Sequence, residues 1–138
     1  IRSRALYTPP VKPQDRFEYF KDADNTIIIF QIEGQQAISQ LDEILRVDGI
    51  DLIFIGPYDL SQSIGMPGQI DHPLVTEKML EIIDLCNKHN VDVGTFVDNM
   101  ENAKRWKRAG VKYLSYSVDT GIFYEASRDL ANKLKSIR

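Results

Sequence analysis

The sequence predicts an α/β fold of four consecutive βα units, and three observations lead to that prediction. Short apolar segments of strand length recur four times along the chain. Each of them is followed by a segment whose apolar residues have helical spacing. Because crossover connections between parallel strands are right-handed, we expect four parallel strands with the helices outside them.

The first two units occupy the first half of the regular pattern. Residues 27–33 are apolar at successive positions, which predicts a parallel strand buried on both faces. Residues 34–46 predict a helix, and residues 51–55 predict a second buried strand. Residues 56–72 are rich in Gly and Pro and predict a functional loop with one helical turn near 60–64.

The last two units repeat this alternation. Pro73 suits the first position of a helix that runs to about His89. A strand over 92–97, a helix, a strand over 113–117 and a final helix over about 121–136 complete the pattern.

The helix after the third strand is predicted to begin at a capping residue, either Asp98 or Asn99. Its buried face is expected to carry Ala103, Trp106 and Ala109. In the helix before that strand, Cys86 has the position of a small buried residue rather than of a nucleophile.

The chain is predicted to form a single domain over residues 1–138. Residues 1–13 predict an irregular loop, and Asp15–Lys21 a short helix. The first residue is Ile1 rather than Met, so the chain is expected either to begin inside a longer natural sequence or to have a processed start.

Two architectures fit four βα units. Such units make about half of a TIM (β/α)₈ barrel, which typically has ~250 residues. The alternative is a four-stranded doubly wound sheet, but no Gly-rich dinucleotide fingerprint follows any strand.

Composition excludes several classes of function. The chain of 138 residues is 43% hydrophobic and 27% charged, with a formal net charge of −3. That charge gives no reason to expect a nucleic acid or an anionic membrane as partner, and no apolar run is long enough to span a bilayer. The single cysteine excludes an internal disulfide, so a cytoplasmic location is expected.

Two carboxylates, Glu33 and Asp59, follow the first and second predicted strands. The C-terminal ends of parallel strands form the active face of such sheets. Carboxylate oxygens brought together there are typical ligands of a hard divalent cation. For Asp59 alone, capping of the turn at 60–64 is the competing interpretation.

The segments Gln31-Ile32-Glu33 and Phe54-Ile55-Gly56-Pro57-Tyr58-Asp59-Leu60-Ser61 resemble motifs of the HpcH/HpaI aldolase family. Residues 65–68, 72–73 and 117–120 extend the similarity over nearly the whole chain. The resemblance implies the C-terminal half of a TIM barrel. It also implies a class II pyruvate aldolase. Such an enzyme cleaves a 4-hydroxy-2-oxo acid to pyruvate and an aldehyde, or forms the acid from these two by condensation.

By this resemblance, Glu33 and Asp59 hold Mg²⁺, Mn²⁺ or Co²⁺, which stabilises a pyruvate enolate. Substrate binding is assigned to Gln31, Gly56, Pro57, Tyr58 and Asp59, with backbone N–H groups near Tyr58 and Asp59 on the substrate carboxylate. Family members carry a catalytic histidine and an arginine in the N-terminal half of the barrel, so the base is expected outside these 138 residues. The resemblance also implies a homo-oligomer whose subunits exchange a terminal helix.

Other interpretations remain open at this point. One alternative is a citryl- or malyl-CoA lyase, which also uses two carboxylates to hold a metal ion. Another is that the half-barrel alone is a non-catalytic metal-binding domain. Gln31 equally suits bonding to a neighbouring strand, and Tyr58 equally suits packing. Asp119 either faces the active mouth or caps the last helix. Neither His72 nor His89 is assigned the role of the base.

Overall fold

The computed structural model describes residues 25–137, so the predictions for residues 1–13 and for Asp15–Lys21 lie outside the described residues. The strands form one sheet in the order β1-β2-β3-β4, and all neighbouring pairs are parallel. The strands are β1 (Ile29–Ile32), β2 (Leu52–Ile55), β3 (Asp92–Val97) and β4 (Tyr113–Tyr116).

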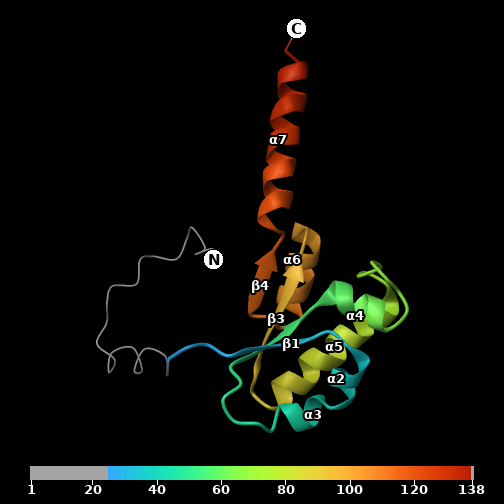
Figure 1. Ribbon diagram of the computed structural model, residues 1–138, viewed down its shortest axis with the longest axis vertical. Helices are drawn as coiled ribbons and strands as arrows, with labels where there is room; N and C mark the ends of the chain where they lie inside the picture. The colour runs from blue at the N-terminus through green and yellow to red at the C-terminus, as the bar shows by residue number, and fades with distance from the viewer. Residues whose placement is uncertain (1–24, 138) are drawn as a thin grey trace, which may run out of the picture.

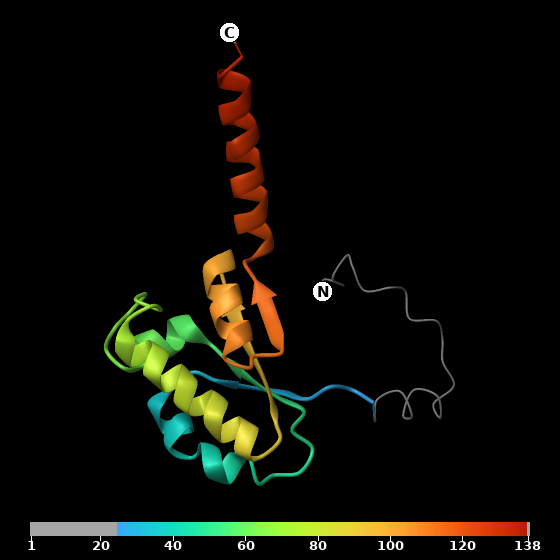
Figure 2. The same ribbon diagram turned by 180° about the vertical axis from the view of Figure 1, so that it is seen from behind.

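Helices alternate with these strands, which confirms the predicted four βα units. They are α2 (Gln35–Ser39), α3 (Leu41–Ile44), α4 (Pro57–Ser63), α5 (Pro73–Lys88), α6 (Met100–Arg108) and α7 (Asp119–Lys135). Opposite views show helices α2 to α6 gathered on one side of the sheet (Figures 1 and 2). A sequential strand order with helices on one side is the arrangement of a barrel segment; a doubly wound sheet has helices on both faces.

The core lies between the sheet and these helices. Ile53 and Ile55 of β2 and Met79, Ile82 and Val75 of α5 are fully buried. Cys86 also lies in this core, as predicted, and burial raises the pKa of its thiol to about 11. At that pKa the thiol stays protonated at neutral pH, so Cys86 acts as a packing residue.

The prediction that residues 27–33 form a strand buried on both faces is wrong. The strand is shorter, Ile29–Ile32, and only Ile32 is buried, while Ile27 to Phe30 are 45–69% exposed. The physical reason is position: β1 is the edge strand of the described sheet, so no neighbouring strand covers its outer side. The apolar pattern is typical of a covered strand, but nothing within residues 25–137 covers the side chains of residues 27–30.

The predicted helix over 34–46 is divided into α2 and α3. The break falls at Gln40, whose φ of −103° and ψ of 4° are not helical. The Ser39 hydroxyl donates to the Gln36 carbonyl oxygen (2.7 Å), a local bond of the kind that competes with a continuous helix.

Three smaller boundaries also differ from the predictions. Pro57 starts α4, so the helix begins before the expected turn near 60–64. The buried face of α6 carries Asn102 with Trp106, and the predicted Ala103 and Ala109 are half-buried. The final helix starts earlier than expected, with Val118 as its N-cap.

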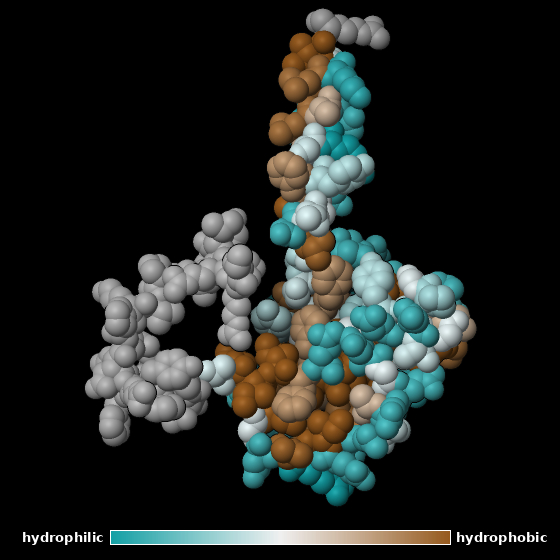
Figure 3. All heavy atoms as spheres, in the orientation of Figure 1, coloured by the Kyte–Doolittle hydropathy of each residue, from teal (hydrophilic) through white to brown (hydrophobic). Residues whose placement is uncertain are grey.

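Two apolar surfaces lack a partner among residues 25–137. Apolar side chains gather over the sheet in Figure 3. Ile29 and Phe30 of β1 and Tyr113 of β4 are large, apolar and 45–48% exposed. Helix α7 projects away from the rest of the chain and buries none of its residues, although Phe123, Leu130 and Leu134 are large and apolar (Figure 1).

Candidate functional site

The centre of the candidate site is the contact between Glu33 and Gly56. Ile32 pairs with Ile55 in the sheet, and the Gly56 N–H donates to the Ile32 carbonyl oxygen (3.2 Å). This register brings the two following residues side by side at the C-terminal ends of β1 and β2. A Cβ atom on residue 56 would lie 2.7 Å from Glu33 Oε2, closer than side-chain atoms normally approach. The missing side chain of Gly56 therefore leaves the space that the Glu33 carboxylate occupies.

Gln31 lies against the same carboxylate. Its Nε2 donates a hydrogen bond to Glu33 Oε2 and would lie 3.2 Å from a Cβ at residue 56. Gln31 and Glu33 are two positions apart on the strand, so their side chains emerge on the same face of the sheet. Gln31 thus fixes the orientation of Glu33 rather than bonding a neighbouring strand.

Asp59 lies in the first turn of α4, directly after β2. Gly56 is the N-cap of this helix and makes no side-chain cap, and Pro57 occupies the first position. Asp59 is therefore inside the helix and is not its N-cap, which removes the competing interpretation of this carboxylate. Its side chain is exposed at the same end of the sheet as Glu33.

The donor set suits a hard cation. Two carboxylates at neighbouring strand ends are oxygen ligands of the kind that Mg²⁺ and Mn²⁺ take, often together with water and substrate oxygens. Within residues 25–137, no three His, Cys, Asp or Glu side chains are grouped so that they could hold a metal ion. The described residues alone thus provide at most a pair of carboxylates here.

Tyr58 bridges two loops at this end of the sheet. Its hydroxyl donates to Asp98 Oδ2 (2.6 Å), and its ring meets Phe96 edge-on at 5.9 Å between centroids. Asp98 follows β3 and also accepts from the side-chain amide of Asn99 (2.8 Å). The hydrogen bond to Asp98, together with burial, raises the pKa of Tyr58 to about 12. Tyr58 therefore connects the segment that carries Asp59 to the end of β3.

This bridge can be tested by titration. Because only the neutral phenol donates, the contribution of the bond to stability is complete below pH 10 and is lost as the pH rises towards 12. We expect Asp98→Asn to lower the pKa of Tyr58 towards 10, since it removes the main cause of the shift. Tyrosinate absorbance against pH measures this, with Tyr58→Phe as the control that removes the titrating group. An unchanged pKa in Asp98→Asn would contradict the bridge.

The remaining polar candidates have local roles. Asn99 caps α6 through a bond from the Asn102 N–H (2.8 Å), which settles the choice between Asp98 and Asn99. Asp119 accepts from the neighbouring Thr120 N–H (2.7 Å) in the first turn of α7. His72 Nδ1 caps α5 by accepting from the Leu74 N–H (3.3 Å).

His89 closes the other end of α5, where its Nε2 lies 2.9 Å from Asp42 Oδ1. This contact is the main reason that the pKa of Asp42 is lowered. The end of α5 leads into the start of β3, so His89 lies at the edge of the sheet opposite to Glu33. Both histidines of the chain are therefore engaged in other contacts: His72 caps α5, and His89 pairs with Asp42.

Sequence reasoning did not identify Asp98 as a partner of Tyr58, because the two residues are 40 positions apart. The only available signal was the placement of each residue after a predicted strand, which puts both at one edge of a parallel sheet.

Comparison with known proteins places this geometry in a family. The chain belongs to the HpcH/HpaI aldolase/citrate lyase family, whose characteristic sequence pattern matches residues 4–126. It is 32% identical over 119 residues to the 5-keto-4-deoxy-D-glucarate aldolase of Escherichia coli O6:H1 (strain CFT073). That match covers 86% of this chain and 46% of the relative.

Solved structures agree with the assignment. An HpcH/HpaI aldolase/citrate lyase family protein from Burkholderia cenocepacia J2315 superimposes with a TM-score of 0.81 at 28% identity, over 88% of this chain and 48% of that one. The citrate synthase SbnG superimposes with a TM-score of 0.73 at 27% identity, over 87% of this chain and 50% of that one. The chain thus spans about half the length of the relatives that it matches.

Proposed function

We propose that the intact protein is a divalent-metal-dependent aldolase. It would cleave a 4-hydroxy-2-oxo acid to pyruvate and an aldehyde, or condense pyruvate and an aldehyde to that acid. The observation that carries this proposal is the Glu33 carboxylate seated against Gly56, one short turn before Asp59. Family membership supports it, and the Escherichia coli relative is named as an aldolase of a keto-deoxy sugar acid.

Glu33 and Asp59 would hold the cation, which the two oxygen donors fit by their chemistry. When bound, a divalent cation would stabilise the negative charge that develops on the C2 oxygen of the pyruvate unit. Gln31 would keep the Glu33 carboxylate turned towards the site through their hydrogen bond. With two protein ligands, coordination positions remain for substrate and water.

The turn over Gly56, Pro57, Tyr58 and Asp59 would bind the substrate carboxylate. The first N–H groups of a helix have no carbonyl partner within it, so those of Tyr58 and Asp59 are available to an anion. The ring of Tyr58, held by Asp98, would border the aldehyde side of the pocket. Because both histidines are engaged elsewhere, the proton-transferring group is expected from residues beyond those described.

A pyruvate-release assay tests the activity. The full-length protein is incubated with Mn²⁺ and a panel of 4-hydroxy-2-oxo acids, including 5-keto-4-deoxy-D-glucarate, and pyruvate is measured. We expect metal-dependent release from at least one acid, and its loss on chelation. No pyruvate from any member of the panel would refute the proposed activity.

A second candidate is a lyase or synthase of citrate-type substrates. The family description includes citrate lyase, and SbnG is a citrate synthase. The same two carboxylates would serve the enolate chemistry of citryl-CoA or malyl-CoA cleavage. Incubation with these thioesters, followed by measurement of acetyl-CoA instead of pyruvate, separates the two candidates.

We also propose that the protein works as a homo-oligomer in the cytoplasm. The exposed apolar side chains of α7 support self-association, because an isolated amphipathic helix is unstable unless that face is covered. The double substitution Leu130→Glu and Leu134→Glu is expected to reduce the oligomer to a smaller species in light-scattering measurements. The matched change Asn132→Glu and Lys133→Glu, on the same helix, should leave the mass unchanged; equal masses for all three proteins would count against α7 as an interface.

A further inference from the structure

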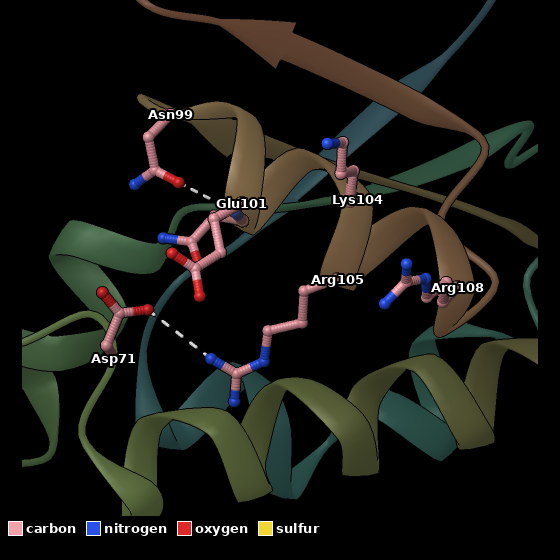
Figure 4. A pocket seen from close by; sticks show the side chains of 7 residues that line it. Asp71, Asn99, Glu101, Lys104, Arg105 and Arg108 are labelled. Carbon is pink, nitrogen blue, oxygen red and sulfur yellow. Dashed lines mark hydrogen bonds and ion pairs between the residues drawn. The ribbon is translucent and has the colours of Figure 1, made fainter.

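A second polar site is a groove along α6, which Asp71 borders from the segment before α5. The hollow has a volume of about 640 Å³, within the range of small-molecule sites, ~300–1,000 Å³. Figure 4 shows Arg105, Lys104 and Glu101 projecting from α6, with Asp71 facing Arg105 from the segment before α5. Neither Glu33 nor Asp59 lines it.

Arg105 is held in place with most of its donors unused. Its Nη2 donates to Thr76 Oγ1 (2.8 Å), and its guanidinium lies 4.9 Å from the ring centroid of buried Trp106. The nearest carboxylate oxygen, on Asp71, is 3.5 Å from Nη1, an ion pair rather than a short hydrogen bond. Arg105 has five N–H donors, so an anion entering the groove meets a guanidinium that is already oriented.

Asn102 adds a side-chain amide to the lining of the hollow. The residue lines the hollow and is only 6% exposed, yet its side-chain amide makes no hydrogen bond to any residue within 25–137. Only its backbone N–H is used, in the cap by Asn99. No buried side-chain nitrogen or oxygen within residues 25–137 lacks a partner, so the Asn102 amide is open to the hollow and can bond a ligand oxygen there.

The charge of the groove favours an anion. Lys104, Arg105 and Arg108 provide three cations against the two carboxylates of Asp71 and Glu101. Among the described residues, neither Lys104 nor Arg108 forms an ion pair. The two free cations and the unpaired amide therefore line one hollow beside the fixed guanidinium.

We propose that this groove along α6 binds a small organic anion through the phosphate or carboxylate groups of that anion. Arg105 and Asn102 fix the anion by hydrogen bonds, and Lys104 and Arg108 supply the further positive charge. This binding does not depend on the proposed aldolase activity, since it uses neither Glu33 nor Asp59 and requires no metal.

Two probes test the groove in the full-length protein, after metal has been removed with a chelating resin so that no metal site contributes. Inorganic pyrophosphate represents a phosphate ligand, and tricarballylate represents a polycarboxylate. Calorimetry is expected to detect at least one of them, and the one that binds identifies the source of the anionic group. The double substitution Lys104→Ala and Arg108→Ala should weaken binding by about tenfold or more.

The control removes two cations elsewhere: Lys133→Ala with Lys135→Ala, on the exposed face of α7. This control should retain the original affinity, whereas Arg105→Lys should lose affinity because lysine lacks the planar fork. Circular dichroism checks that both variants in the groove are still folded. Absence of binding by both probes, or an equal loss in the α7 control, would overturn the proposal.

Discussion

Glu33→Gln and Asp59→Asn are each expected to abolish divalent-metal binding while leaving the fold intact. Each change replaces a charged oxygen ligand by a neutral amide of the same shape, and hard cations bind carboxylates far more strongly. Loss of a direct ligand should exceed the roughly 10–100-fold that changes to outer-shell partners cost. Calorimetric titration of each variant with Mn²⁺ measures the effect.

The matched controls are Glu43→Gln on α3 and Asp84→Asn on α5, two exposed carboxylates on helices. They remove the same charge without touching the sheet edge that carries Glu33. Unchanged Mn²⁺ affinity in both site variants, or an equal loss in the controls, would refute the assignment of the metal ligands.

Gly56→Ala is expected to disturb the site with little effect on the fold. The new Cβ would lie 2.7 Å from Glu33 Oε2 and 3.2 Å from Gln31 Nε2. Both atoms end flexible side chains, so they can move aside, and the φ of −89° at residue 56 is open to alanine. The carboxylate must then leave its position, and we expect Mn²⁺ affinity and aldolase turnover to fall by about tenfold or more, as when other outer-shell contacts are lost.

Gly34→Ala provides the control for this substitution. Gly34 is the N-cap of α2 as Gly56 is of α4, and a Cβ at residue 34 would meet no atom within 4 Å. Both variants therefore incur a similar cost of alanine at an N-cap, roughly 0.5–1 kcal/mol. Thermal unfolding should shift equally in the two variants, and only Gly56→Ala should lose metal. Equal metal affinity in the two variants would contradict the proposed closeness of Gly56 and Glu33.

Much of the fold follows from sequence periodicity. The long helix α5 matches its prediction closely, because Pro73 marks its start and its apolar residues keep helical spacing over several turns. For the short helix α4 the sequence predicts too late a start, although Pro57 carries the same signal at its first position. Gly56 and Gly65 flank this helix, and such glycines favour a loop in the sequence pattern.

Burial was predicted less well than the elements themselves. The apolar run of 27–33 correctly indicated a strand, but its exposure depends on what lies beyond the edge of the described sheet. A central strand and an edge strand whose apolar side chains are covered by another segment have the same local sequence pattern. The same holds for α7, whose apolar face has no partner within residues 25–137.

The candidate site was predictable as far as topology reaches. Glu33 and Asp59 both follow strands that end at one edge of the sheet, a placement that needs only the order of the elements. The hydrogen bond between Tyr58 and Asp98 needs the actual spacing of two loops, which residue type does not encode. The fit of Glu33 against Gly56 likewise depends on the register of Ile32 with Ile55.

The most direct test of the metal assignment is a crystal structure of the full-length protein soaked with Mn²⁺ and pyruvate, with an anomalous-difference map. We predict one strong anomalous peak at the C-terminal edge of the sheet, coordinated by both the Glu33 and Asp59 carboxylates. The oxygens of pyruvate should complete its coordination. An ordered edge without a peak, or a peak bound by neither carboxylate, would contradict the account.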